Sequence, residues 1–547
     1  MSTRMERTES SELAQRFLHW AQAQPDALAI RFGMPGATED ISFEELWHRV
    51  ERVTGHLHAS WGVQAGDRVA WLSLNHDLQC ACLIACARLG AIFMPLNYRL
   101  AAAELAQVVA DAKPMLLIHD TLHKGLAQEV VAHSKSIARQ SAGLDALIQA
   151  PPSKDFALPA LAQNAPVLLV YTSGTTGLPK GAVHTQAGLL ANVRASHAAH
   201  EFRKDDQVLS TLPMFHVGGL CIQTLPALVS GVAVHLHPRF DAGAWLHAVT
   251  QGPLSQRPSV SLLVPAALRA VLDHADWPNA DLQSLRGIMA GSSTLPASYL
   301  EAFHARGVPV GQIYGCTETG PVSVVLPFEH AMQRAGFAGW PQPELALKLQ
   351  PVMVDGKAVP EASELTVTSD HGTVGEVCVR GPNVMQGYWQ AHGKSEQAYE
   401  TGLNDGWFNT GDLGWLDETG CLQIVGRNKD MIISGGENIY PAEIENHLMA
   451  MPGVLECAVL GMAHEHWGEV PVAVLVPSVD APAQGLTPAS VLTYLQSHIA
   501  RFKMPRRVVI VDALPKNALG KVQKAVLQQQ LMQIQGATHA NASADLV

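Results

Sequence analysis

The sequence predicts an α/β fold, with a large N-terminal region of βαβ-built sheets followed by a small α+β C-terminal domain. Three observations lead to this prediction. The chain has 547 residues, of which 47% are hydrophobic, so more than one packed core is expected. From Asp67 onward, strand-like patterns alternate with helical patterns, as is typical of parallel βαβ units. Near residue 427, a charged run and a glycine turn open a last stretch long enough for a separate domain.

The first elements can be placed from their apolar patterns. A strand is expected over residues 67–74, a helix over the cysteine-containing stretch 78–93, a helix over 103–112 and a strand over 114–120. In sheets of this kind, ligands bind beyond the carboxyl ends of the strands. A surface connection is expected over 147–165 and a disordered tail over 535–547. The domains are expected to span residues 1–427 and 428–547.

Composition and charge argue against several classes of protein. The formal net charge of −12 makes broad binding to nucleic acids or anionic membranes unfavourable. The N-terminal stretch lacks the apolar run of a secretory signal, and no uninterrupted apolar segment is long enough to span a membrane. A cytoplasmic protein is therefore expected. Cys80, Cys82 and Cys86 share one apolar stretch, and we interpret them as buried core residues rather than metal ligands.

The stretch YTSGTTGLPKGAVHT, residues 171–185, is rich in glycine and hydroxyl side chains. A strand pattern over 166–170 precedes it, and a helical pattern with Thr185 as N-cap follows. We expect this loop to join a strand to a helix and to bind phosphate, because its backbone N–H groups, hydroxyls and Lys180 can all donate hydrogen bonds. It is not a Walker A loop, since a glycine follows the lysine. The alternative is a flexible, solvated loop.

Three further motifs follow along the chain. QIYGCTETG covers residues 312–320, GWFNTGDLG and GRNKD lie within 406–430, and LPKNALGKVQK covers 514–524. Together with the first loop, these motifs resemble the adenylate-forming (AMP-binding) superfamily of acyl-CoA synthetases, nonribosomal adenylation domains and luciferases. Four motifs in the same order make the resemblance specific, and it covers nearly the whole chain. It implies a carboxylate–CoA ligase that uses ATP, Mg²⁺ and CoA.

The resemblance implies an ATP site built from the first three motifs. Tyr314 matches the aromatic residue that stacks on adenine, and Asp412 and Arg427 match the ribose contacts. A carboxylate can accept hydrogen bonds from both ribose hydroxyls. Residues 290–294 match a loop beside the adenine, although they depart from its usual small-residue and proline pattern. The implied ATP contacts are Thr172, Ser173, Gly174, Thr175, Thr176, Gly177, Lys180, Gly291, Ser292, Ser293, Tyr314, Asp412 and Arg427.

Three residues are implied in catalysis. Thr317 matches a hydrogen-bond donor to the α-phosphate, and Glu318 matches a carboxylate that binds magnesium. Lys521 matches a lysine that stabilises negative charge while a carboxylate attacks the α-phosphate. The competing interpretation is that Glu318 and Lys521 are ordinary surface charges.

The superfamily carries out two half-reactions, and the resemblance implies both. A carboxylate and Mg-ATP give an acyl-adenylate and pyrophosphate, and a thiol then displaces AMP. Between these steps the mobile C-terminal domain rotates about a hinge, which corresponds to Lys429. The rotation removes Lys521 from the site and brings in a glycine loop that lines the pantetheine tunnel. The implied CoA contacts are Gly435, Gly436, Trp467, Lys503 and Arg99.

The stretch LPMFHVGGL, residues 212–220, resembles the superfamily segment that lines the acyl pocket. His216 matches the histidine at the pocket mouth. An amino-acid substrate would need a buried acidic partner for its ammonium group, and this stretch has no Asp or Glu. We therefore expect an apolar acid, either a medium-chain fatty acid or an aryl carboxylate. The implied acyl contacts are His216, Val217, Gly218, Gly315 and Cys316.

Three functions other than a CoA ligase are alternatives. An adenylating enzyme could load an acyl carrier protein in trans, and a luciferase-like oxygenase would share the same motifs. A nucleotide-binding regulator without turnover is a further alternative, although the intact Lys180, Glu318 and Lys521 argue against it. A homodimer is one option for the assembly.

Overall fold

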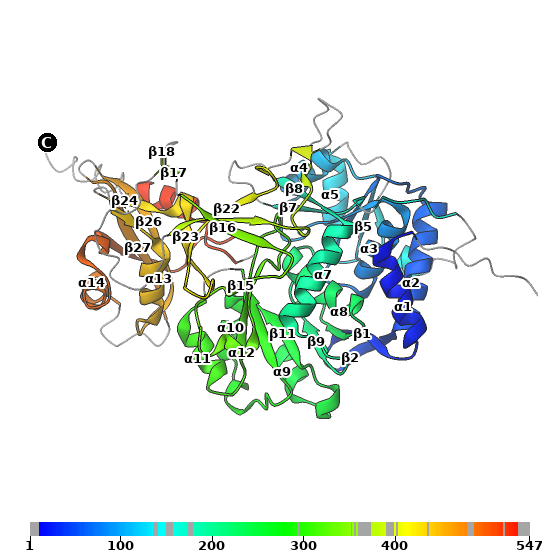
Figure 1. Ribbon diagram of the computed structural model, residues 1–547, viewed down its shortest axis with the longest axis horizontal. Helices are drawn as coiled ribbons and strands as arrows, with labels where there is room; N and C mark the ends of the chain where they lie inside the picture. Colours follow the sequence, from blue (N-terminus) through cyan, green and yellow to red (C-terminus); the bar gives the residue numbers. More distant parts are fainter. Residues whose placement is uncertain are drawn as a thin grey trace, which may run out of the picture.

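The computed structural model describes residues 10–134, 141–148, 157–162, 164–172, 179–292, 295–351, 353–354, 357–358, 374–389, 399–400, 403–434, 437–464, 467–478, 486–517 and 520–533. A large N-terminal body contains two long sheets, and a smaller C-terminal unit with its own sheet lies beside it (Figure 1). The expected α/β architecture is confirmed.

The first sheet has nine strands and a parallel centre. Strands β1, β10, β9, β11, β12 and β13 pair in parallel, and antiparallel strands flank them. In spatial order the strands are β15 (Trp340–Pro341), β14 (Val324–Leu326), β13 (Val310–Tyr314), β12 (Gly287–Gly291), β11 (Val260–Leu263), β9 (Gln207–Ser210), β10 (Ala233–Leu236), β1 (Leu28–Met34) and β2 (Ala37–Ser42).

The second sheet has eight strands and is also parallel at its centre. Strands β8, β20 and β21 add an antiparallel edge. The spatial order is β21 (Tyr399–Glu400), β20 (Gly387–Trp389), β8 (Lys180–Thr185), β7 (Pro166–Thr172), β4 (Ile92–Pro95), β3 (Arg68–Leu72), β5 (Leu116–His119) and β6 (Ser141–Gly143).

Helices cover both faces of each sheet. Strand β3 illustrates the arrangement, because Val69 and Trp71 pack with the helices between the sheets, whereas Ala70 and Leu72 pack outward. The central helices are α1 (Glu12–Ala23), α2 (Phe43–Gly55), α3 (Asp77–Leu89), α7 (Gln186–His200) and α8 (Leu225–Val229). The outer helices are α4 (Ala102–Ala112) and α5 (Lys124–Ser134) on the second sheet, and α9 (Ala242–Thr250), α10 (Pro265–Leu272) and α11 (Ala297–His304) on the first.

Helix α3 accounts for the cysteine-containing stretch. Every residue from Asp77 to Leu89 is buried, because the helix lies between the two sheets. The helix ends before Gly90, whose φ of 69° is left-handed, and β4 then begins at Ile92. The expected helix over 78–93 was therefore too long at its C-terminal end. Its three cysteines are buried core residues as expected.

The phosphate-binding loop has different neighbours from those predicted. Strand β7 ends at Thr172, and the chain returns as a second strand, β8, which pairs antiparallel with β7. Helix α7 begins only after β8, with the Thr185 hydroxyl accepting a hydrogen bond from the Gly188 N–H. The expected strand-to-helix junction was wrong because Lys180–Thr185 forms a largely buried strand that pairs with β7 on one side and with β20 on the other. The N-cap at Thr185 was correct.

Three further sheets follow the N-terminal layers in the described residues, and the smallest is the pair β17 (Met353–Val354) and β18 (Lys357–Ala358). One contains β16 (Ala346–Gln350), β19 (Gly375–Arg380), β22 (Phe408–Leu416) and β23 (Leu422–Arg427). A 3₁₀ turn, Asn428–Asp430, then leads to another sheet. That sheet is formed by β25 (Glu437–Ile439), β24 (Ile432–Ser434), β27 (Gly468–Pro477), β26 (Val454–His464) and β28 (Arg507–Ile510), and it packs with α13 (Pro441–Ala450) and α14 (Pro488–Gln496).

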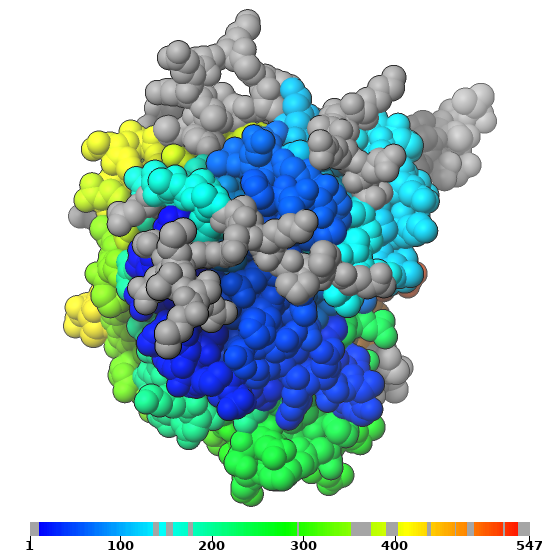
Figure 2. Space-filling model, turned by 90° about the vertical axis from the view of Figure 1, so that its right-hand side faces the viewer, coloured from blue at the N-terminus to red at the C-terminus, as the bar shows by residue number. Residues whose placement is uncertain are grey.

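The N-terminal helices form the face of the molecule farthest from the C-terminal sheet (Figure 2). The blue surface of Figure 2 belongs to early elements, with green residues of the first sheet's helices below them. Among the residues that the structure describes, none of the helices is long and apolar enough to cross a membrane. Two expected features, the surface connection and the C-terminal tail, fall wholly or partly outside the described residues.

A buried ion pair between α2 and α3 yields a stability prediction. Arg49→Ala should lower the free energy of unfolding by about 3 kcal/mol, because Asp77, 2% exposed, loses its arginine partner. Arg31→Ala, which removes a pair with the half-exposed Asp40, should cost about 1 kcal/mol or less. Urea unfolding at pH 7 measures both losses, and equal losses would contradict the prediction.

The same pair should make stability fall in acid. Burial alone raises the pKa of Asp77, but His76 and Arg49 outweigh it and hold that pKa below its usual value. The contribution of the pair is therefore present above the unfolded-state pKa, about 3.9, and is lost as the pH falls below it. In the Arg49→Ala variant, the free energy of unfolding should therefore fall less than in the wild type when the pH is lowered through this range, as urea unfolding at several pH values would measure.

Candidate active site between the two domains

The centre of the site is a cross-strand ion pair. Asp412 of β22 and Arg427 of β23 are register partners in an antiparallel pair, so their side chains emerge side by side. The Arg427 Nε atom lies 2.9 Å from Asp412 Oδ1. Asp412 is 8% exposed, and its charge is held by this arginine rather than by water.

Tyr314, the last residue of β13, contacts the same carboxylate. Its hydroxyl donates to Asp412 Oδ2 at 2.9 Å and lies 3.2 Å from the hydroxyl of Thr410. Burial raises the pKa of Asp412, although Arg427, Tyr314 and Lys521 oppose this effect. Burial, and then Asp412, raise the pKa of Tyr314 well above its usual value, so its hydroxyl keeps its proton. Adenine and ribose candidates from two different motifs are thus brought together.

Lys521 reaches this centre from the C-terminal domain. Its ammonium group interacts electrostatically with Arg427, Asp412 and Cys316, and with His216. The Lys521 side chain is still accessible to solvent, although protein atoms surround it. The pKa of Lys521 is lowered, first by desolvation and then by the positive charge of Arg427. Asn517 closes the turn before it, since the Asn517 Oδ1 accepts from the Lys521 N–H at 3.0 Å. The lysine is therefore placed at the ribose candidates.

Glu318 forms a second polar group beside the loop after β7. Its Oε1 atom accepts a hydrogen bond from the Tyr388 hydroxyl at 2.9 Å and lies 3.5 Å from the Thr172 hydroxyl. The Lys180 ammonium lies 5.2 Å from the centre of the Tyr388 ring. Five of the predicted phosphate contacts fall outside the described residues, namely Ser173, Gly174, Thr175, Thr176 and Gly177.

The oxygen chemistry of Glu318 fits a magnesium ion bound together with phosphate. Across the described residues, no group of three or more His, Cys, Asp or Glu side chains is able to hold a metal ion. A magnesium ion here would therefore take a carboxylate from Glu318 and its remaining ligands from phosphate and water, which is the usual arrangement for this cation.

The loops around Thr317 and Gly291 are tightly built. Thr317 is 5% exposed, and the side chain of His184 bonds its backbone. A Cβ atom at Gly291 would overlap the carbonyl oxygen of Ile313, so only glycine fits there. Ser292 follows with a φ of 83°, a strained value for a residue with a side chain. Ser293, the last ATP candidate of this loop, lies outside the described residues.

His216 stands at the start of an unusual helix. Its Nδ1 atom accepts a hydrogen bond from the Gly218 N–H at 3.0 Å, so the ring proton of the neutral form is on Nε2. Burial, and then Lys521, lower the pKa of His216 to about 4. Gly218 is the first residue of the helix η2 (Gly218–Thr224), and Val217 directly precedes it. Element η2 is a π-helix, a rare type of helix that is often found at functional sites. Gly315 leaves no room for a Cβ atom beside Pro321.

A set of buried apolar side chains lies where the site-bearing segments meet, and we name it the inner apolar cluster. Each member is close in sequence to a candidate site residue or lies on a helix or strand that packs against one. None of its members is charged. The cluster consists of Ala195, Ala199, Leu212, Ile222, Leu262, Met289, Ile313, Val322 and Val325.

The predicted CoA contacts are not gathered at Lys521. Arg99 follows β4, with its guanidinium over the rings of Tyr98 and Phe215. Lys503 is paired with Glu443 at 2.7 Å. The remaining candidates are Trp467, which is exposed on the C-terminal domain beside Arg506, and Gly435 and Gly436, which fall outside the described residues. The hinge candidate Lys429 is exposed in the 3₁₀ turn that follows β23.

Three contributing residues were not identified from the sequence. Tyr388 bonds Glu318, Thr410 bonds the Tyr314 hydroxyl, and His184 bonds the Thr317 backbone. Thr410 stands two residues before Asp412 in GWFNTGDLG, so the motif itself offered a signal for it. Tyr388 and His184 carry no such local signal.

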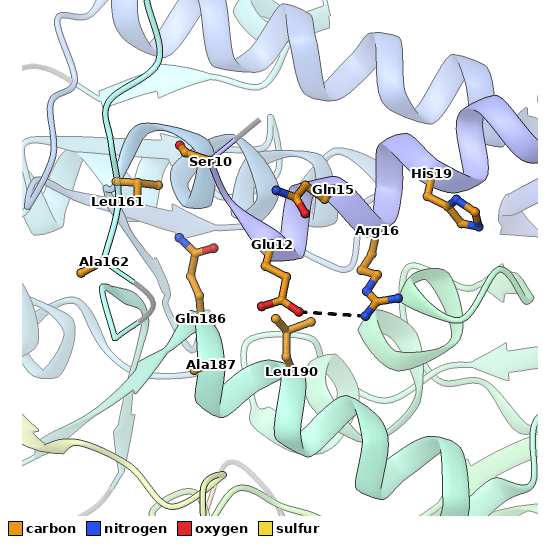
Figure 3. Close-up of a pocket in the computed structure, with 10 residues that line it drawn as sticks. All are labelled: Ser10, Glu12, Gln15, Arg16, His19, Leu161, Ala162, Gln186, Ala187 and Leu190. Carbon is orange, nitrogen blue, oxygen red and sulfur yellow. Dashed lines mark ion pairs between the residues drawn. The ribbon is translucent and has the colours of Figure 1, made fainter. Parts of the chain in front are cut away.

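A separate cavity of about 470 Å³ opens between α1 and the start of α7 (Figure 3). Its walls are mostly polar, with Glu12 and Arg16 forming an ion pair at 3.9 Å on one side and Gln186 on the other. It shares no residue with the ATP, acyl or CoA candidates, and the chemistry described above does not involve it.

Comparison with known proteins agrees with this geometry. Residues 17–389 match the AMP-binding enzyme family, and residues 443–521 match the AMP-binding enzyme C-terminal domain. The chain is 42% identical over 526 residues to the indoleacetate–CoA ligase of Aromatoleum aromaticum, covering 95% of this chain and 98% of the ligase. It is 39% identical over 511 residues to a feruloyl-CoA synthase of Amycolatopsis, covering 93% and 97%.

A solved structure of a CoA synthetase also matches this chain over most of its length. O-Succinylbenzoate coenzyme A synthetase from Bacillus subtilis, in complex with ATP and magnesium, matches with a TM-score of 0.77 and 30% identity over 93% of this chain and 98% of that chain. The chain therefore belongs to the AMP-binding enzyme family. It is an ATP-dependent, AMP-forming acid–CoA ligase, and its substrates ATP and CoA and its cofactor magnesium are those expected from the sequence.

The position of Lys521 leads to a prediction about the first half-reaction. Lys521→Ala should slow acyl-adenylate formation by about 10²–10³-fold, because the transition state loses a positioned charge. Thioester formation from supplied acyl-adenylate should persist. Pyrophosphate release measures the first step. Lys524→Ala, which removes a lysine paired with Glu445, is the control and should leave adenylation nearly unchanged. Equal loss of both half-reactions in Lys521→Ala would contradict the assigned role.

Proposed function

We propose that this ligase activates an aromatic carboxylic acid and transfers its acyl group to CoA. The observation that supports this proposal most directly is the electrostatic grouping of Lys521 with Asp412, Arg427, Cys316 and His216. Leu212 and Ile313, from the segments that carry His216 and Cys316, belong to the inner apolar cluster. The proposed nucleotide site, charge-stabilising lysine and apolar region therefore come from neighbouring segments. Adenylation of an acid needs all three.

In the first half-reaction, the chain's residues bind, orient and stabilise charge. Asp412 accepts hydrogen bonds from the ribose hydroxyls, and Tyr314 lies against the adenine. Thr317 donates to the α-phosphate, and Glu318 would hold the magnesium ion that neutralises phosphate charge. Lys521 stabilises the charge that develops as the carboxylate attacks phosphorus and pyrophosphate leaves, since that charge is greater in the transition state than in the substrates.

In the second half-reaction, the C-terminal domain turns about Lys429. The change from one sheet to the next after Arg427 supports a domain boundary between residues 427 and 428. The rotation would remove Lys521 and place the loop that contains Gly435 and Gly436 beside the acyl-adenylate. Trp467, Lys503 and Arg99 remain proposed CoA contacts. Lys503 is the weakest of these, because Glu443 already neutralises its charge.

The acid is proposed to be aromatic rather than a fatty acid. The acyl segment, residues 212–220, has no Asp or Glu that could pair with the ammonium group of an amino acid. Two relatives that match over nearly their whole length are an indoleacetate–CoA ligase and a feruloyl-CoA synthase, and both of these acids carry an aromatic ring. Aryl acids therefore rank above the medium-chain fatty acids that the sequence alone also allowed.

The other functions are not favoured. The named relatives are CoA ligases and synthetases, which argues for free CoA over a carrier protein and against a regulator or an oxygenase. We also propose a cytoplasmic location, where ATP and CoA are both available. A homodimer stays a prediction, which the molar mass in solution tests.

A panel of acids tests the substrate class. Indole-3-acetate, a hydroxycinnamate, benzoate, octanoate and phenylalanine are compared by their specificity constants for pyrophosphate release with the wild-type enzyme. An aromatic acid without an amino group should have the highest constant, because the acyl segment has no acidic partner for an ammonium group. Octanoate should follow at a lower value. Phenylalanine equal to the best acid would overturn the apolar assignment.

The hinge is tested by restricting its backbone. Lys429→Pro should reduce CoA transfer far more than adenylation, because proline fixes φ at a residue that must change conformation. A first-turn position in a 3₁₀ helix tolerates proline in the present arrangement, with a modest cost at Asn428. Single-turnover rates of the two steps make the comparison, and Lys429→Ala is the control. Unchanged thioester formation in Lys429→Pro would place the hinge elsewhere.

A further inference from the structure

A buried amide next to the acyl segment has an unused hydrogen-bond acceptor. Gln223 lies on the π-helix η2 and is 1% exposed. Its Nε2 atom lies 3.1 Å from Nε2 of His200, and its Oε1 atom has no partner within the described part of the chain. Leaving a buried polar atom unpaired costs about 1–3 kcal/mol, so such an atom calls for an explanation.

The proton positions on His200 determine which way this amide points. The His200 Nδ1 atom lies 2.9 Å from the backbone carbonyl oxygen of Ser196, so Nδ1 must be the donor. Burial lowers the pKa of His200 to about 4, which keeps the ring neutral at pH 7. The Nε2 atom of the ring is then an acceptor, and it takes its hydrogen bond from the amide N–H of Gln223. The amide oxygen is left free.

The amide lies farther along the helix that begins beside His216. Gly218, a candidate acyl contact, and Gln223 are five residues apart, which is about one turn of a π-helix with its i→i+5 hydrogen bonds. The preceding residue, Ile222, belongs to the inner apolar cluster. The amide also adjoins the inner apolar cluster through its partner, because Ala199 of the cluster precedes His200. The free oxygen therefore lies near the cluster beside which we place the ring of an aryl acid.

Helix α7 holds this part of η2 in place. The Asn192 amide donates to the carbonyl oxygen of Cys221 at 2.7 Å, and the Ser196 hydroxyl donates to the carbonyl oxygen of Ile222. Asn192 also accepts from the Val322 N–H at 3.3 Å, which ties η2 to the segment after Glu318. The backbone that carries Gln223 is thus fixed relative to the catalytic residues, as a specificity contact requires.

We propose that Gln223 determines substrate specificity by accepting a hydrogen bond from a ring-borne N–H or O–H group of the acid. This inference rests on the proposed function and narrows the aromatic acids to those with a neutral donor remote from the carboxylate, such as an indole N–H or a phenol O–H. An acid without the donor leaves the buried oxygen unpaired, and sites of this kind discriminate strongly against such analogues.

Two matched pairs of acids test the contact. Indole-3-acetate is compared with 1-benzothiophene-3-acetate, and 4-hydroxycinnamate with cinnamate, by specificity constants for pyrophosphate release. In each pair the second acid has nearly the same shape but lacks the donor. The wild-type enzyme should prefer the donor acid of at least one pair by about 10–100-fold, which corresponds to one buried hydrogen bond. Gln223→Met should reduce that preference to about threefold or less.

A control variant separates specificity from folding. Gln79 is another buried amide, and its Nε2 donates to the carbonyl oxygen of Met214 at 3.0 Å. Gln79→Met should change the constants of both members of a pair by the same factor. If Gln223→Met does not fold, Gln223→Asn keeps the amide but withdraws its oxygen by one methylene, and it should also weaken the preference.

The outcomes distinguish this inference from the function on which it rests. An active wild-type enzyme with equal constants within both pairs would overturn the role of Gln223 alone. A uniform loss for both members of a pair in Gln223→Met would also overturn it, because it would indicate a purely structural residue. An enzyme that activates none of the four acids would overturn the proposed function together with this inference.

Discussion

The cross-strand pair of Asp412 and Arg427 is the interaction on which the site depends. A carboxylate as buried as Asp412 is stable only when neighbours hold its charge, and the antiparallel register of β22 and β23 provides the arginine. The same carboxylate accepts from Tyr314 and attracts Lys521, so three motifs are oriented by one group. Arg427 is also the last residue before the 3₁₀ turn, so the candidate ribose residues lie directly before the connection between the domains.

The layered body determines where the substrates can meet. Two sheets with parallel centres share one layer of helices, and the carboxyl ends of β12 and β13 carry Gly291 and Tyr314. The inner apolar cluster lies among these segments, and α7 bonds to η2 beside it. The candidate nucleotide residues and Lys521 lie close together because the chain returns repeatedly to the carboxyl ends of these strands. The ligase activity follows from that convergence.

Much of the site could be predicted because its residues stand in short, ordered motifs. Tyr314, Glu318, Asp412, Arg427 and Lys521 were all named from such motifs, and the structure brings the ribose candidates and the lysine together. The strand after the candidate phosphate loop was missed, because a short buried strand and the start of a buried helix have similar local patterns. Tyr388 was missed as well, since it bonds Glu318 across 70 residues of sequence.

The sequence by itself determined the family, the two-part α/β organisation, the identities of the ATP candidates and the apolar character of the acid segment. These properties depend on local motifs and on apolar periodicity, and both can be recognised in the sequence without knowledge of the fold. Only the tertiary structure decided which partners hold each charge, that β8 intervenes before α7, and that Gln223 keeps a free acceptor beside the inner apolar cluster. Hydrogen-bond satisfaction in a buried site depends on residues distant in sequence, and only packing brings them within reach.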